Sequence, residues 1–244
     1  MTNMKRDSSP VVFQRKKIDY ELKIREFPWT DKQKELISLI LSKDVKILFL
    51  NGPAGTSKTL TSVYCGLKLL NDKKVSDFLY IRPIVESSDS QLGALPGTAS
   101  EKIHPYMIVL EDKLIELLPS PEIKKLQDDN RINAMPVSFT RGCHWPCKYI
   151  FIDESQNYSR RELITLMTRV GEFSKVVISA DPAQSDLKKD KQGAFIELLN
   201  LFSDEESKKN GIYTFSFDKN DIIRSGIVRF IIEKLEKDNG KMFV

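Results

Sequence analysis

The stretch Lys46-Ile-Leu-Phe-Leu-Asn51-Gly52-Pro-Ala-Gly55-Thr-Ser57-Lys58-Thr59 decides the fold. Its apolar first half predicts a buried strand, its small residues predict a tight turn, and the segment from Thr59 to Leu70 predicts a helix. The glycines allow successive backbone N–H groups to point at phosphate oxygens, and the helix N-terminus favours the same anion. The sequence therefore predicts a phosphate-binding loop for a nucleotide.

Each residue of this loop has an expected role. We expect Lys58 to reach the β- and γ-phosphates and the Thr59 hydroxyl to bind Mg²⁺. Ser57 stands where the strict pattern G-x-x-x-x-G-K-[ST] has its second glycine. We expect Ser57 in the first helical turn with a negative φ, as a variant that lowers affinity or rate. Besides these three, the residues expected to bind the nucleotide are Gly52, Pro53, Ala54, Gly55 and Thr56.

Two later strands end in acids and amides. The first ends in Asp153, which can hold Mg²⁺ through water, and Glu154, which can polarise the attacking water. Gln156 follows and is expected to sense the γ-phosphate or that water. The second strand leads into Asp181-Pro-Ala-Gln184. We expect Gln184 to couple the state of the nucleotide to the binding of the protein's partner. Both lie at carboxyl ends of strands, where open α/β sheets bind their ligands.

Short apolar runs alternate with amphipathic segments from Thr30 onward, which is typical of an α/β fold with a mostly parallel sheet sandwiched between helices. The predicted strands are Lys46–Asn51, Asp77–Arg82, Pro136–Phe139, Lys148–Asp153, Lys175–Asp181 and Ile212–Phe217. The predicted helices follow capping boxes at Thr30 and Ser159 (the latter stopping at Gly171) and cover Thr59–Leu70, Pro105–Leu118, Gly193–Phe202 and Ser225–Glu236. Pro119–Asn133 and Ser203–Asn210 are expected to be surface connections. We predict a single core domain, residues 30–244, after a basic N-terminal extension, residues 1–29.

Composition narrows the class of protein. The 244 residues are 41% hydrophobic and 30% charged, which excludes collagen-like and wholly disordered chains. No apolar run approaches the roughly 20 residues of a membrane helix, and Met1–Pro10 is polar, so we expect no membrane partner. Three cysteines are typical of a reducing compartment, so we expect a cytoplasmic protein. Residues 1–30 hold seven basic and four acidic residues, which could contact phosphates or form a solvated tail.

At this point the chain resembles a known family. The boxes Gly52–Thr59, Asp153–Gln156 and Asp181–Gln184 resemble motifs I, II and III of superfamily 1 helicases. The closer resemblance is to the PhoH-like, phosphate-starvation-inducible P-loop ATPases, and it covers roughly residues 27–235. It rests on Ile81–Glu86, Leu92–Gly97, Glu101–Tyr106, Thr140–Gly142, Asp153–Asn157 and Asp221–Val228.

The resemblance implies a RecA-like P-loop NTPase core with ATPase activity, using ATP and Mg²⁺. It also implies a ring-like homo-oligomer, a role on RNA or single-stranded DNA, and a bacterial or phage-infected host cytoplasm. The sequence departs from the family at Ser57, at Ser225-Gly226, where the family usually has His-Pro, and in the Cys143–Cys147 segment. The first departure bears on catalytic rate.

Four further residues are candidates for roles in binding or catalysis. Gln33 could read adenine, as the Gln upstream of motif I does in similar helicases, or simply complete the capping box of Thr30. Arg82 could contact a nucleic-acid backbone or the γ-phosphate, or form a surface ion pair. Arg141, in a Thr-Arg-Gly turn, could bind phosphate. Arg224 could act as an arginine finger on a neighbouring subunit's nucleotide, or flank a helix.

The leading hypothesis is an ATP-hydrolysing motor or remodeller acting on RNA or single-stranded DNA. One alternative is a nucleoside kinase of the thymidine-kinase type, which also pairs a P-loop with an Asp-Glu-x-Gln box. Another is a slow, nucleotide-gated switch that acts through protein partners. Cys143, His144 and Cys147 suggest zinc, but a structural site needs four ligands and only Cys65 and His104 remain, so reduced cysteines are expected.

Overall fold

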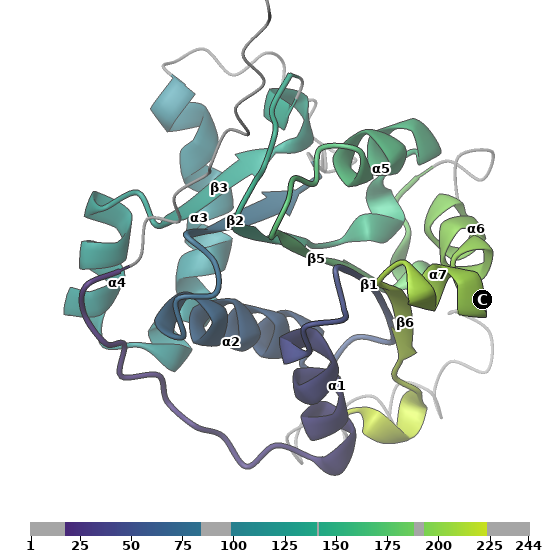
Figure 1. Cartoon of the computed structure of the whole chain (residues 1–244), viewed down its shortest axis with the longest axis horizontal. Coiled ribbons are helices and arrows are strands. Elements are labelled where there is room, and N and C mark those ends of the chain that lie inside the picture. Colours follow the sequence, from purple (N-terminus) through teal and green to yellow (C-terminus); the bar gives the residue numbers. More distant parts are fainter. Residues whose placement is uncertain (1–17, 84–98, 141, 188–192, 224–244) are drawn as a thin grey trace, which may run out of the picture.

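The computed structural model describes residues 18–83, 99–140, 142–187 and 193–223. Six strands form one all-parallel sheet in the order β3-β2-β4-β5-β1-β6 (Figure 1). The strands are β1 (Ile47–Asn51), β2 (Asp77–Arg82), β3 (Ile132–Pro136), β4 (Lys148–Ile152), β5 (Lys175–Ala180) and β6 (Ile212–Ser216). The helices are α1 (Asp31–Leu41), α2 (Lys58–Asn71), α3 (Ala99–Leu117), α4 (Ser120–Asp128), α5 (Arg160–Met167), α6 (Ala194–Leu201) and α7 (Glu205–Lys209).

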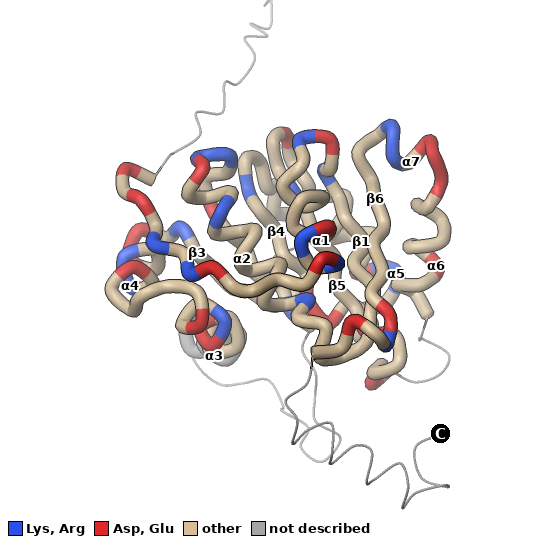
Figure 2. Tube along the Cα trace, turned by 90° about the horizontal axis from the view of Figure 1, so that it is seen from below, with Lys and Arg blue, Asp and Glu red and all other residues tan. Residues whose placement is uncertain are grey.

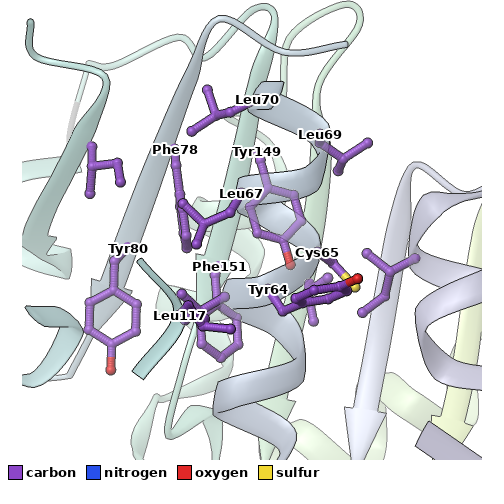
Figure 3. Packing of buried hydrophobic residues seen from close by; sticks show 14 of the residues in the cluster. Tyr64, Cys65, Leu67, Leu69, Leu70, Phe78, Tyr80, Leu117, Tyr149 and Phe151 are labelled. Carbon is purple, nitrogen blue, oxygen red and sulfur yellow. The ribbon is translucent and has the colours of Figure 1, made fainter. Parts of the chain in front are cut away.

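Helices cover both faces of the sheet, as predicted. Helices α1, α2, α3 and α4 pack on one face, and α5 and α6 pack on the other (Figure 1). Figure 3 shows the first face, where Leu67 and Leu70 of α2 lie against rings from β2 and β4. Because β4 and β5 are covered on both sides, their side chains are almost continuously buried, which explains their unbroken apolar sequences.

The sheet order brings the predicted site together. Strand β5 pairs with both β1 and β4, so it separates the strand before the phosphate loop from the strand before the acid pair. Asn51 is level with Ala180 across the β1–β5 pair, and Ile152 is level with Ile81 across the β4–β2 pair. The loops that follow these four strands therefore start side by side at the carboxyl ends of the strands.

Residues 18–29 of the predicted N-terminal extension pack against the core. Ile18 and Leu22 are each only 4% exposed, and the Arg25 N–H donates to the Leu117 carbonyl at 2.8 Å. The segment runs from α4 past α2 to α1. Basic and acidic residues are interspersed along it (Figure 2). It holds two basic and three acidic residues, so this part is neither a solvated tail nor basic. The basic excess lies in residues 1–17, outside the described part.

One predicted strand was misplaced. Strand β3 covers Ile132–Pro136, whereas the prediction began at Pro136, and Val137–Thr140 instead form a 3₁₀ turn. Strand β3 is the edge of the sheet and its side chains alternate between buried and half-buried, so it lacks the continuous apolar signal of the central strands. Pro136 is tolerated at the end of this edge strand, where it needs no ladder partner for an N–H.

Two stretches predicted as surface connections contain helices. Pro119–Asn133 holds α4, whose Ile123 and Leu126 are buried beneath charged neighbours. Ser203–Asn210 holds the short α7, capped by the side chain of Asp204. Because both stretches are rich in charged residues, the apolar face of α4 and the N-cap of α7 were not recognised in the sequence. The helix predicted at Ser225–Glu236 lies outside the described residues.

Helix α5 begins at its predicted capping box but ends four residues before Gly171. Thr168 is the C-cap residue, and its hydroxyl donates to the carbonyls of Ile164 and Thr165. Gly171 serves a different purpose: a Cβ there would lie 2.7 Å from the Pro146 nitrogen. The glycine thus permits close packing of the Cys143–Cys147 segment, and Trp145 in that segment is 3% exposed.

Within the described ranges, none of the helices combines the length and the apolar character that crossing a bilayer requires.

Gly66 offers a test of the packing between α2 and the sheet. A Cβ at this position would lie 2.6 Å from the Tyr149 ring and 2.9 Å from the Phe78 ring. Helix propensity alone predicts that Gly66→Ala stabilises the protein by about 1 kcal/mol. Overpacking costs about 1–3 kcal/mol, so we expect a net loss of about 0–2 kcal/mol. A guanidinium unfolding curve measures it, and a higher midpoint for the variant would contradict this packing.

Candidate active site

The predicted phosphate loop connects β1 to α2 and has the expected shape. Gly55 has a φ of 84°, in the left-handed region that glycine adopts without strain. Gly52 has no room for a side chain, because a Cβ there would lie 2.7 Å from the Cβ of Phe217. The loop is also tied to the chain beyond β6, since the Ile223 N–H donates to the Gly55 carbonyl at 2.8 Å.

Ser57 departs from its expected conformation. It has φ 63° and ψ 27°, a left-handed conformation, so the expectation of a negative φ was wrong. A non-glycine residue in this region carries a cost of roughly 1–2 kcal/mol. Its side chain accepts no capping hydrogen bond at the start of α2, so nothing visible there repays the strain. The position therefore retains the backbone geometry of a glycine while holding a serine.

Lys58 and Thr59 open α2 and point into the site. The Lys58 ammonium donates to the carbonyls of Gly52 at 2.6 Å and Pro53 at 2.9 Å. Burial lowers its pKa, against the opposing effect of the carboxylates of Asp181 and other nearby acids. The ammonium thus lies folded over the loop, in a place from which it can turn towards a phosphate.

Asp153 lies at the end of β4 and is almost fully buried. Its Oδ2 accepts from the hydroxyls of Thr59 at 3.2 Å and Tyr80 at 3.1 Å. Burial first, and then the charge of Glu154, raises the pKa of Asp153 to about 6. A carboxylate and a threonine hydroxyl in contact are hard oxygen ligands, so this pair fits Mg²⁺. Tyr80 was missed, because only the pairing of β2 with β4 brings it to Asp153.

A chain of hydrogen bonds links the acid pair to the phosphate loop. The Gln156 amide donates to Glu154 at 2.5 Å and accepts from the Asp181 N–H at 3.0 Å. The Asp181 carboxylate then accepts from the Ala54 N–H of the loop at 2.7 Å. The sequence singled out Asp181 as an acid at a strand end but not as a residue of the site. The sheet order that places β5 beside β1 was the missing information.

The expected coupling residue, Gln184, has a more peripheral position. It is exposed, and its N–H donates to the Asp181 carbonyl at 3.0 Å. Gln184 lines the site cavity of about 340 Å³ together with Lys58, Thr59 and the acids. Lys113 and Glu116 of α3 also line this cavity, and sequence reasoning missed both because α3 has no motif that marks them.

Gln33 satisfies its capping role and also reaches the phosphate loop. Its side chain accepts from the Thr30 N–H at 3.0 Å, completing the capping box. Its amide nitrogen donates to the Thr56 carbonyl at 3.4 Å. Gln33 is 3% exposed and lies beside the phosphate loop.

Of the three arginines singled out, Arg82 lies beside the site. Its Nη2 is 3.4 Å from Oε1 of Glu154, which matches the ion-pair reading. Arg141 and Arg224 fall outside the described residues.

The described cysteines do not suggest zinc. Cys65 and Cys147 are buried, and Cys143 is half-buried with its thiol directed at the Phe139 carbonyl. Among the described side chains, no group of three or more His, Cys, Asp or Glu could hold a metal ion. Burial raises the pKa of the Cys65 thiol, which keeps it protonated.

Ser57→Gly tests the strain in the phosphate loop. Glycine removes the Cβ penalty but loses more entropy on folding, so we expect the melting temperature to rise by about 1–4 °C. Ser57→Ala is the matched control, because it keeps the Cβ and removes only a hydroxyl that makes no cap. Differential scanning fluorimetry should show no gain for alanine. An equal gain for both variants, or a loss for glycine, would contradict the strain.

Asp153→Asn tests the buried carboxylate. Its raised pKa means that the folded state holds a proton which the unfolded state releases between about pH 4 and 6. Stability without ligand therefore falls as pH rises through that window, and the cost persists above pH 6. We expect the variant to gain roughly 2–3 kcal/mol at pH 7.5 and almost nothing at pH 4.

Chemical denaturation of both proteins at the two pH values measures this difference. The hydroxyls of Thr59 and Tyr80 can rotate to accept from the new amide, so the hydrogen bonds need not be lost. A gain that is the same at both pH values would show that the charge of Asp153 is not its cause.

Comparisons with known proteins agree with the geometry. The family model for PhoH-like proteins matches residues 27–236. The PhoH-like protein of Bacillus subtilis (strain 168) is 30% identical over 207 residues, covering 85% of this chain and 63% of that protein. The PhoH-like protein of Mycobacterium bovis is 32% identical over 206 residues, covering 84% and 56% respectively. This chain thus spans about six-tenths of the length of the curated relatives it matches.

Solved structures give weaker similarities. The Pif1 helicase from Candida albicans has a TM-score of 0.44 at 19% identity, covering 87% of this chain and 44% of that one. The Sulfolobus solfataricus SWI2/SNF2 ATPase core, in complex with dsDNA, has a TM-score of 0.47 at 16% identity, covering 86% and 49%. These low scores carry no weight in the assignment, which rests on the family model and the loop geometry. The chain belongs to the PhoH-like family and has the core of a P-loop NTPase.

Proposed function

We propose that this chain binds and hydrolyses ATP in the cavity between the phosphate loop and the acid pair. The observation that carries the proposal is the convergence of Lys58, Thr59, Asp153 and Glu154 on one cavity from α2 and the end of β4. An ordinary strand–turn–helix has no reason to place a half-buried lysine, a hydroxyl and two acids around a glycine-containing loop at a helix N-terminus. A P-loop ATPase requires that combination.

The geometry supports a division of roles. The N–H groups at the start of α2 would hold the β- and γ-phosphates, and Lys58 would leave the carbonyls of Gly52 and Pro53 to neutralise them. Mg²⁺, held by Thr59 and Asp153, would offset charge on the phosphates. Glu154 would accept a proton from water as the water oxygen bonds to the γ-phosphorus and the bond from that phosphorus to the ADP oxygen breaks.

We further propose that hydrolysis drives movement or remodelling on RNA or single-stranded DNA. The described part is one core, so strand separation would need several subunits, in line with the expected homo-oligomeric ring. Arg224 would then reach a neighbouring nucleotide in trans, although Ile223 is bonded to Gly55 of its own chain. Arg82, and Arg141 by the family resemblance, would contact the strand. The family makes a bacterial or phage-infected cytoplasm the expected location.

A slow switch is the second candidate, and one observation favours it. Ser57 imposes strain on the loop, and both Lys58 and Glu154 are bonded to other groups of the protein. This restraint of the site favours low basal turnover, which a slow switch requires. Stimulation by nucleic acid separates the two, because only the motor should respond to it.

Lys58→Ala tests the proposed ATPase. Phosphate release from ATP is measured with and without single-stranded RNA and DNA of mixed sequence. Loss of the charge that stabilises the transferred phosphate should reduce turnover at least about 100-fold. Lys34→Ala is the matched control, because Lys34 is an exposed lysine on α1 that pairs only with Asp31 among the described residues.

The outcomes discriminate between the candidates. Turnover that rises with nucleic acid, is lost in Lys58→Ala and is kept in Lys34→Ala supports the motor. Basal turnover that is indifferent to nucleic acid supports the switch. Turnover that survives in Lys58→Ala would contradict an ATPase site at this loop.

A further inference from the structure

A second cavity lies on the other side of the acid pair. It has a volume of about 580 Å³ and is lined by residues that include Arg82, Glu154, Asn157, Gln184 and Asp186. Glu154 and Gln184 line both this cavity and the nucleotide cavity, so they form the wall between them. A ligand in the second cavity would therefore touch the residue proposed as the catalytic base.

Two protein side chains hold the Glu154 carboxylate. Its Oε1 lies 3.4 Å from Nη2 of Arg82, and its Oε2 accepts from the Gln156 amide at 2.5 Å. Both carboxylate oxygens are thus engaged by protein groups. A general base needs a free oxygen within hydrogen-bond reach of the attacking water. In this arrangement Glu154 is restrained from acting.

We propose that the second cavity binds a backbone phosphate of single-stranded nucleic acid, and that this phosphate draws Arg82 away from Glu154 and so releases the base. Arg82 is then a positioning residue that couples nucleic-acid binding to hydrolysis. This inference rests on the proposed ATPase function, because it regulates the same Glu154.

The chemistry of the second cavity fits a phosphodiester. Arg82 is the single cation among the described residues that line it, and a guanidinium binds phosphate oxygens through paired donors. Asp186 is tied back, because its carboxylate accepts from the Asn157 amide at 3.0 Å and its N–H donates to the same side chain at 2.8 Å. A phosphate that takes Arg82 from Glu154 replaces one anionic partner of the guanidinium with another.

The amides favour a single strand over free phosphate. The exposed Gln184 side chain offers donors and an acceptor to a ligand in this cavity, which is large enough for a nucleotide. Base edges that are occupied by pairing in a duplex are free in a single strand, where such side chains can bond to them. The cavity thus provides for both a phosphate and an adjacent base.

Release of Glu154 would also reach the phosphate loop. The Gln156 side chain that holds Glu154 accepts from the Asp181 N–H, and the Asp181 carboxylate accepts from the Ala54 N–H. The second cavity and the nucleotide therefore lie at opposite ends of one continuous chain of polar contacts. A change in Glu154 alters the partner of Gln156, which positions Asp181.

Arg82→Gln tests the proposal in the full chain. A half-exposed ion pair is worth up to about 1 kcal/mol, so we expect basal kcat without nucleic acid to rise about two- to fivefold, with KM for ATP unchanged. Stimulation by oligo(dT) or oligo(U) should largely disappear, and fluorescence anisotropy should show weaker binding of the labelled oligonucleotide. Arg160→Gln is the matched control, because it removes an exposed arginine paired with Glu197 at 2.9 Å.

Other results would overturn the inference. A fall in basal kcat, or undiminished stimulation by the oligonucleotide, would mean that Arg82 does not restrain Glu154. If inorganic phosphate stimulated the wild type as well as the oligonucleotide does, the nucleic-acid assignment would be wrong. Arg82→Lys serves if the glutamine variant fails to fold: it keeps the charge but loses the paired donors, so partial loss of stimulation is expected and full stimulation would count against the proposal.

Failure of the proposed function gives a different pattern. A wild type that neither turns over ATP under any condition nor binds MgADP by calorimetry would refute the ATPase, and the release of Glu154 with it. A wild type that turns over ATP, with an Arg82→Gln variant identical to it in every measurement, would refute only the role of Arg82.

Discussion

Strand β5 lies between β1 and β4, and its parallel pairing with both is the constraint on which the site depends. The pairing brings Asp181 to the Ala54 N–H of the phosphate loop and to the Gln156 side chain beyond β4. Without this pairing, no hydrogen bonds would connect the phosphate loop after β1 with the acid pair after β4. With it, the buried side chains of Gln156 and Asp181 connect the two by hydrogen bonds.

The site uses groups that cost stability. Asp153 is a buried carboxylate, Lys58 is a partly desolvated ammonium, and Ser57 adopts a left-handed backbone conformation. Each is unfavourable in the protein alone, and the proposed Mg²⁺ and phosphates would offset the charges of Asp153 and Lys58. Burial of the apolar side chains on both faces of the sheet stabilises the fold and offsets the cost of these groups. The fold therefore holds these three groups in unfavourable states before a ligand binds.

Much of this arrangement was predictable from sequence, and the exceptions have physical causes. Strands buried on both faces, such as β1 and β4, carry an unbroken apolar signal, and the capping boxes at Thr30 and Ser159 fixed two helix starts. Edge strand β3 and the charged helix α4 carry weaker patterns, so they were misassigned. The conformation of Ser57 depends on the loop, and the contacts of Asp181 depend on strand order, which local sequence does not encode.

Hydrogen–deuterium exchange with and without MgADP tests the central claim most directly, because it reports on the backbone N–H groups of the phosphate loop. If these groups hold the phosphates, exchange should slow across residues 54–59, while the exposed helix α7 serves as an internal reference. Slower exchange should extend to residues 153–156 and 181, through the Gln156 network. Unchanged exchange in residues 54–59 at saturating MgADP, with protection elsewhere, would contradict the account.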